Sequence, residues 1–65
     1  MSINRKIKNL RKEKGYKQSY ISFRTGIPQS TLSRFENGKC SLTIIELEKI
    51  IVSLDLKLNI SIEIP

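Results

Sequence analysis

Three glycine-containing breaks divide residues 1–39 into short segments, and this spacing constrains the fold most. Gly15, Gly26 and the pair Asn37-Gly38 each follow a run with helical apolar spacing. Glycine is the residue best able to adopt the positive φ of a helix C-terminus, so each break predicts a helix end. Helices this short are marginal in water on their own, and the segments must therefore share one core.

The first two segments carry the spacing of amphipathic helices. Residues 3–14 predict a helix with one apolar stripe on an otherwise cationic surface, formed by Ile3, Ile7 and Leu10. A second helix of about two turns begins at Lys17 or Gln18 and ends at the next glycine break. We expect this helix to turn Ile21 and Tyr20 toward the core.

Pro28 predicts the start of a third helix, because proline at the first helical position loses no hydrogen bond and its fixed φ suits the helix. Leu32 and Phe35 give this helix an inner face, and Asn37-Gly38 ends it. The second and third segments are therefore two short helices joined by a tight glycine turn. That is the geometry of a helix-turn-helix.

The run Thr43-Ile-Ile-Glu46 predicts the start of a fourth helix. It is typical of a capping box, in which the side chains of Thr43 and Glu46 satisfy free amides of the first turn. Helical apolar spacing continues through Ile44, Leu47, Ile50, Ile51 and Leu54. The sequence has no internal repeat, low-complexity segment or linker, so we expect residues 1–55 and the segment 56–65 to belong to the same domain.

After Asp55 the apolar period changes to strict alternation, which predicts a β-strand over residues 56–64. All five residues of one face are apolar: Leu56, Leu58, Ile60, Ile62 and Ile64. Nothing else in the sequence has strand patterning, so this strand would leave an unpaired edge within one protomer. We therefore expect residues 56–65 of two protomers to pair as antiparallel strands and so to form a homodimer. A frayed or covered tail is the alternative.

The charge of the chain is one-sided. Residues 1–39 hold ten Lys and Arg and two acidic residues, net +8, whereas residues 40–65 hold two basic and four acidic residues, net −2. Neutralising phosphates releases counterions, so a basic field of this kind favours nucleic acid. An anionic membrane surface would attract the same charge.

Several classes of function lack the residues that they require. No apolar run approaches the ~20 residues of a membrane span, and no signal-peptide core follows the charged start. We expect a soluble, cytoplasmic protein with no membrane partner. Cys40 is the only cysteine and there is no histidine, so no disulfide within the chain and no ordinary zinc site can form. We therefore predict that the protein is not an enzyme, has no catalytic residues and binds no metal or cofactor.

The region from Gly15 to Lys39 contains GYKQSYIS and then TGIPQSTLSRFENGK. It resembles the XRE/Cro repressor family, whose pattern has a glutamine opening the second helix, a glycine turn, and a Ser-x-aromatic-Glu-x-Gly ending to the third. The likeness continues through residues 43–54 and implies a mainly α, lambda-repressor-like fold of four helices. Two residues depart from the pattern: Lys17 replaces a Ser/Thr cap, and Ser22 replaces an alanine.

The resemblance implies that the third helix lies in the major groove of DNA with its first residues on base edges. Gln29 can bond adenine bidentately, and Arg34 can bond guanine. The expected base-reading set is Gln29, Ser30, Thr31, Ser33 and Arg34. The alternative is that these are ordinary solvated residues of a polar helix.

A second set of residues is expected to hold the DNA backbone. Gln18 stands at a helix start, where amides and the helix dipole favour an anion, and Gly38 lets the backbone approach. The set comprises Lys17, Gln18, Ser19, Asn37, Gly38 and Lys39. In the family, the residues matching Arg11 and Glu36 pair and lock the first helix to the third, so we expect this pair to be structural. The other basic residues of the first helix are expected to contribute only a general field.

Two such units joined through residues 56–64 would bind an inverted-repeat operator whose half-sites lie about one helical turn apart, ~34 Å. A helix that passes straight into this strand, through SLDLKL at 53–58, resembles the HipB-type antitoxins. This resemblance implies an antitoxin that represses its own operon and binds a HipA-type kinase toxin. Two alternatives remain. One is a stand-alone XRE-family repressor or restriction-modification controller protein, and the other is a protein-interaction adaptor without DNA binding.

Overall fold

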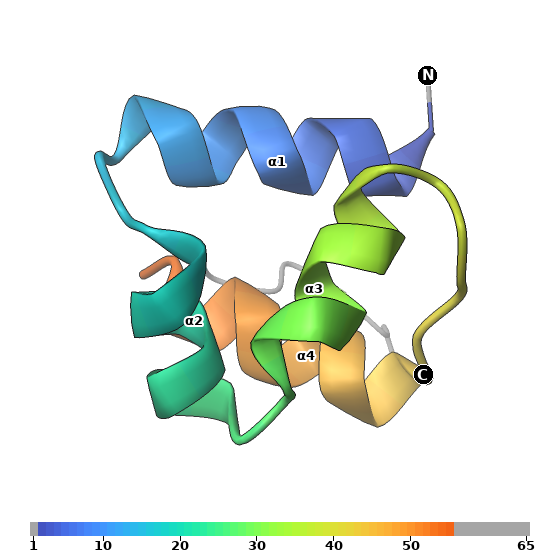
Figure 1. Cartoon of the computed structure of the whole chain (residues 1–65). Coiled ribbons are helices and arrows are strands. Elements are labelled where there is room, and N and C mark those ends of the chain that lie inside the picture. The colour runs from blue at the N-terminus through green and yellow to red at the C-terminus, as the bar shows by residue number, and fades with distance from the viewer. Residues whose placement is uncertain (1, 56–65) are drawn as a thin grey trace, which may run out of the picture.

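A computed structural model describes residues 2–55, which form four α-helices around a small core (Figure 1). The helices are α1 (Ile3–Glu13), α2 (Gln18–Thr25), α3 (Gln29–Glu36) and α4 (Ile44–Ser53). α3 packs against both α1 and α2, and α4 packs against α2. The predicted mainly α fold of four helices is confirmed. The strand predicted at 56–64 lies outside the described residues.

The core draws on every helix and on the turn between α2 and α3. Its members are each 4% exposed or less: Ile7, Ile21, Ile27, Leu32, Phe35, Ile50 and Leu54. Burying a side chain of this size contributes about 1.5–3 kcal/mol. Helical spacing in the sequence identifies all of them except Ile27, which lies in the turn and belongs to no periodic pattern.

Three apolar side chains expected to face the core lie at the surface instead. Ile3 is 53% exposed and Ile44 is 79% exposed, and each stands in the first turn of its helix. Tyr20 is 37% exposed. α2 buries only Ile21 and Thr25, one turn apart, and the residue before Ile21 is rotated off that narrow face.

The turn between α2 and α3 is held by side chains as well as by glycine. Gly26 has φ +76°, and its N–H donates to the carbonyl of Ser22, which ends α2. The Ser22 hydroxyl donates to the carbonyl of Ile27 at 2.6 Å, and Thr25 Oγ1 accepts from the Ile27 N–H at 3.2 Å. Ser22, where the family pattern has alanine, therefore adds a hydrogen bond to the turn.

The helix starts differ in how well they are capped. The capping box of α4 is confirmed: the Glu46 N–H donates to Thr43 Oγ1 at 3.1 Å, and the Thr43 N–H donates to Glu46 Oε1 at 2.9 Å. At the start of α2, Lys17 makes no side-chain capping bond. The first amides of α2 are therefore not satisfied by their own cap residue.

The end of α4 is tied to the loop that enters α2. Tyr16 Oη donates to Asp55 Oδ2 at 2.7 Å, and Asp55 has a left-handed backbone with φ +57°. This hydrogen bond, with the nearby carboxylate charge, raises the pKa of Tyr16. The ring of Tyr16 also lies against Tyr20, with centroids 4.9 Å apart. The bond between Tyr16 and Asp55 joins residues that are far apart in the sequence.

Candidate nucleic-acid interface

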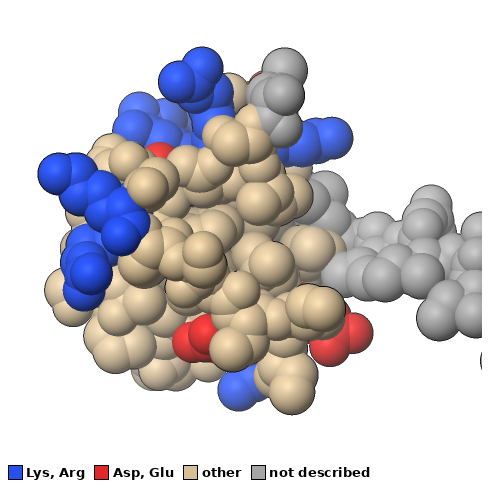
Figure 2. All heavy atoms as spheres, turned by 90° about the vertical axis from the view of Figure 1, so that its right-hand side faces the viewer, with Lys and Arg blue, Asp and Glu red and all other residues tan. Residues whose placement is uncertain are grey.

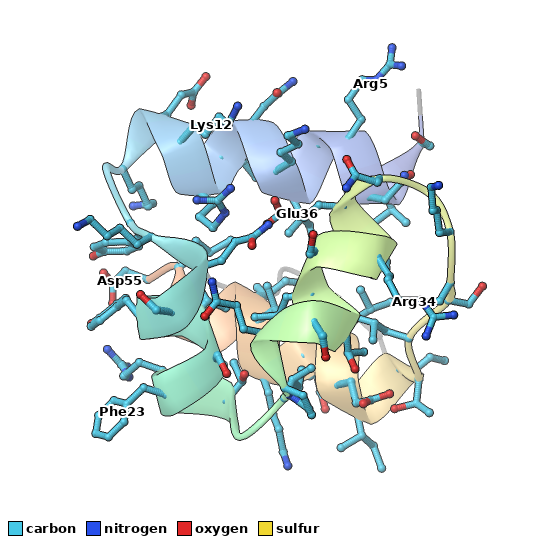
Figure 3. The ribbon with its side chains drawn as sticks, in the orientation of Figure 1. Arg5, Lys12, Phe23, Arg34, Glu36 and Asp55 are labelled. Carbon is cyan, nitrogen blue, oxygen red and sulfur yellow. The ribbon has the colours of Figure 1, made fainter. Side chains whose placement is uncertain are left out.

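α3 presents one polar face to solvent. Its opposite face is buried through Leu32, Phe35 and Glu36. All five residues expected to read bases lie on the remaining arc: Gln29, Ser30 and Arg34 are exposed, and Thr31 and Ser33 are half-buried. Ser30 and Arg34 stand one turn apart on the same side of the helix, as do Gln29 and Ser33. Figure 3 shows Arg34 projecting away from the core.

A buried polar cluster joins the first three helices behind this face. Arg11 Nε donates to Glu36 Oε2 at 2.7 Å, and Arg11 Nη2 donates to Glu36 Oε1 at 2.9 Å. The two side chains are 11% and 3% exposed, respectively. Arg11 Nη1 also donates to the carbonyl of Tyr16 at 2.7 Å. The structure therefore places Arg11 and Glu36 in a bidentate ion pair between α1 and α3.

Gln18 joins the same cluster from the start of α2. Its Nε2 donates to Glu36 Oε1 at 3.0 Å, and the side chain is half-buried. The sequence pattern assigns Gln18 to the DNA backbone and gives no sign of this contact. No local signal could reveal it, because residues 18 and 36 are brought together only by the packing of α2 on α3.

The cluster sets the charge state of Glu36. Burial of the carboxylate acts to raise the pKa of Glu36, but the hydrogen bonds from Arg11 and Gln18, with the charges of Arg11 and Lys8, outweigh burial and lower it. The carboxylate is therefore ionised at neutral pH. Its negative charge is held against a guanidinium, which reduces the repulsion that a carboxylate would exert on a nearby polyanion.

The residues expected to hold the DNA backbone flank the ends of α2 and α3. Lys17 and Ser19 are exposed at the start of α2, and residues 37–39 are exposed in the loop after α3. Both groups lie toward the α1 side of the molecule (Figure 1). Gly38 has φ +73°, and a Cβ at this position would lie 3.1 Å from Asn4 Nδ2. The left-handed conformation therefore favours glycine there, and a larger residue would also require the Asn4 side chain to shift.

The basic side chains of the described residues are concentrated in one part of the surface. Figure 2 shows Lys and Arg along the upper and left-hand edges of one face, with most of the acidic groups toward its lower end. Glu13 and Glu36 are the acidic residues within 2–39, and the second is neutralised by Arg11. Charge alone would also suit an anionic membrane surface. None of the helices α1–α4 has the length and apolarity to cross a bilayer.

Residues 7–61 match the family described as Helix-turn-helix. The antitoxin HipB of Escherichia coli strain K12 is 35% identical over 54 residues, which cover 83% of this chain and 61% of that protein. The chain thus spans about three-fifths of the length of this curated relative. Among solved structures, the restriction-modification controller protein C.AhdI from Aeromonas hydrophila matches with a TM-score of 0.79 and 24% identity, covering 83% of this chain and 82% of that one. At this identity the structural likeness concerns the fold alone.

Proposed function

This chain belongs to the helix-turn-helix family of DNA-binding regulators, of the XRE type, and from this premise we propose that it binds a specific operator through α3. The observation that carries the proposal is the polar outer arc of α3. Behind this arc lies the Glu36 carboxylate, whose charge is balanced by Arg11. Exposed residues proposed to contact phosphates flank the arc at the start of α2 and at residues 37–39. Family and fold are those of regulators rather than of enzymes.

Gln29 and Arg34 are the proposed principal base contacts. They stand five positions apart on α3, ~7.5 Å along the helix axis and about 140° apart around it. The two side chains are therefore proposed to contact different base pairs of the half-site. Gln29 offers the donor and acceptor pair that matches adenine, and Arg34 offers the two donors that match guanine. The smaller hydroxyl residues Ser30, Thr31 and Ser33 fill the groove between them.

The backbone contacts are proposed to come from the start of α2 and from residues 37–39. An amide group carries two N–H donors, and Gln18 gives one of them to Glu36. The other remains for a phosphate oxygen, with Lys17 and Ser19 beside it. Asn37, Gly38 and Lys39 hold the opposite side of the groove. In this proposal Glu36 orients Gln18 toward the phosphate.

We propose that the DNA-binding unit works as a homodimer. Residues 56–64, with their alternating apolar face, are the proposed pairing strand, and residues 1–55 are the DNA-binding domain. A two-fold dimer of this kind favours an inverted-repeat operator with half-sites ~34 Å apart. Each α3 then reads one half-site.

We further propose that the chain is an antitoxin that represses its own operon and binds a HipA-type kinase toxin. The identity to the antitoxin HipB supports this proposal. So does Phe23, which is 85% exposed and lines one hollow with Tyr16 and Tyr20. Exposed aromatic surface is typical of a site that binds another protein. Phe23 points away from the body of the molecule on the side of α2 that lies away from α3 (Figure 3).

A second candidate is a stand-alone repressor or restriction-modification controller protein. The likeness of the fold to the controller protein C.AhdI favours it. The two candidates share their operator chemistry and differ in the need for a protein partner. A kinase-like gene beside the gene of this chain would favour the antitoxin.

Selection of bound sites from random DNA with the full-length chain tests the operator proposal. The expected product is an inverted repeat whose half-sites are about one helical turn apart, bound with an affinity that falls as salt rises. Absence of any enriched sequence, or an affinity that does not respond to salt, would favour the adaptor without DNA binding.

Co-expression with a HipA-type kinase tests the antitoxin proposal. Phe23→Ser should reduce co-purification of the kinase and leave operator binding intact. Val52→Ser, at a residue that is 63% exposed on α4, is the matched control. If the wild-type chain retains no kinase, the stand-alone regulator is the better description.

A further inference from the structure

A polar hollow lies between α1 and the C-terminal end of α3, beside the residues assigned above. Its lining includes three cations and three amides: Arg5, Lys8, Lys12, Asn4, Asn9 and Asn37. From the sequence alone, the basic residues of α1 are expected to contribute only a general field. The structure instead gathers three of them into one concave surface.

The three cations share one side of α1. Arg5, Lys8 and Lys12 are spaced at i, i+3 and i+7, which places them in a row along the helix. The buried residues of α1, Ile7 and Arg11, lie to one side of this row. Lys8, next to them, is half-buried, whereas Arg5 and Lys12 are exposed. Figure 3 labels Arg5 and Lys12 on α1 and Glu36 on α3, and the Arg5 side chain points away from α3.

The hollow has a net positive charge despite the carboxylate at its edge. Among its lining residues only Glu36 is acidic, and that carboxylate is held in the ion pair with Arg11. Lys8 lies close enough for its charge to help lower the pKa of Glu36. Three cationic groups therefore remain to act on an external anion.

The hollow is continuous with the loop that follows α3. Asn37 lines it and is also one of the proposed backbone contacts. The Asn4 amide stands against Gly38, within 3.1 Å of where a Cβ would be. A strand of DNA that touches residues 37–39 would therefore pass directly to this surface.

We propose that this hollow binds phosphate groups of the DNA backbone adjacent to the half-site read by α3. The inference rests on the operator binding proposed above and adds α1 to it. Ammonium, guanidinium and amide N–H groups are the donors that phosphate oxygens accept. The six named groups offer no aromatic side chain on which a base could stack, so a phosphodiester backbone fits better than a free nucleotide.

Matched triple variants of the full-length chain test the proposal. Arg5→Gln, Lys8→Gln and Lys12→Gln together remove the three cations of the hollow. Lys6→Gln, Lys14→Gln and Lys49→Gln remove the same charge from positions outside its lining. The dissociation constant for the selected operator and for an unrelated duplex is measured over a series of salt concentrations.

The hollow variant should lower the slope of log affinity against log salt by roughly 0.9 for each phosphate that it no longer neutralises, to equal extent on both duplexes. Its preference for the operator should stay near that of the wild type. The control triple should change the slope much less. Equal changes for the two triples would overturn the proposal and leave only a general field. A wild-type chain without preference for any sequence would instead overturn the operator proposal, which separates the two failures.

Ethylation of single phosphates gives a second, independent readout. Phosphates whose ethylation weakens binding of the wild type should include some that no longer matter for the hollow variant. Arg5→Gln with Lys12→Gln alone suffices here, because both side chains are exposed and their replacement should leave the fold intact. A pattern of interference identical to that of the wild type would overturn the proposal.

Discussion

Gln18 and Glu36 meet in a hydrogen bond of 3.0 Å, from the amide Nε2 to the carboxylate Oε1 that Arg11 also holds. One oxygen atom thus receives donors from both α1 and α2 while its own side chain belongs to α3. The contact ties the start of the helix proposed to hold a phosphate to the end of the helix proposed to read bases. The ion pair that stabilises the fold therefore also orients the two helices of the motif.

Arg11→Ala should destabilise the protein strongly. It would leave the Glu36 carboxylate, 3% exposed, without its cation, and breaking a buried pair in this way costs about 3–5 kcal/mol. Urea unfolding followed by circular dichroism measures the change. Arg24→Ala, at an exposed arginine bonded to Tyr20, should cost far less. The double variant Arg11→Met with Glu36→Leu should recover much of the stability. An Arg11→Ala variant as stable as the wild type would contradict the role given to the pair.

Stability should fall as the solution is acidified below about pH 4.5, the ordinary pKa of a glutamate. The pKa of Glu36 is lowered in the folded state, so the unfolded state binds more protons in this range. The stabilisation is therefore present above this pH and is lost as Glu36 is protonated. Glu36→Gln should be less stable at pH 7 and should show a flatter dependence on acid. The capping box also lowers the pKa of Glu46, so protonation of Glu46 likewise reduces stability in acid. Glu46→Gln therefore serves as the comparison.

Arg34→Ala should weaken operator binding by roughly 1–3 kcal/mol and relax the base preference at one position of each half-site. The physical reason is the loss of the two parallel donors that match guanine. Competition binding with operators substituted at single positions measures both effects. Arg24→Ala, which removes a basic residue of α2, should leave the base preference unchanged. An equal loss on every sequence would mean that Arg34 contacts only phosphate.

Gly26→Ala should lower stability by about 1–2 kcal/mol through backbone strain alone, since φ is +76° and an added Cβ would meet no atom within 4 Å. Gly26→Asn should cost less, because asparagine tolerates the left-handed region better than alanine. Thermal unfolding of the two variants measures the difference. Equal melting temperatures for Gly26→Ala and the wild type would show that this turn carries no such strain.

Ile60→Glu should convert the proposed dimer to a monomer that binds the operator weakly. The charge would fall on the apolar face of the predicted strand, whereas Ser61→Glu would fall on its polar face and should leave the dimer intact. Truncation after Asp55 should act like Ile60→Glu. Sedimentation measures the oligomeric state, and a dimer that survives both the substitution and the truncation would exclude pairing through residues 56–64.

Much of the fold of residues 2–55 could be predicted from the sequence because its signals are local. Gly26 ends α2, and the Thr43 and Glu46 capping box begins α4, through contacts within a few residues of each other. Helical spacing identifies Leu32 and Phe35 as core because the period of the helix alone decides which residues share a face. The match to a known motif then indicates the arrangement of α2 and α3.

Only the tertiary structure decided how the helices meet. It exposed Ile44 and Tyr20, brought Gln18 to Glu36, and gathered the cations of α1 into a hollow beside Asn37. Periodicity states which residues share a face but not how far a neighbouring helix covers that face. The sequence alone therefore determined where the helices are and which chemistry they carry. Packing decided which of those side chains are neutralised in the core and which remain free to act on DNA.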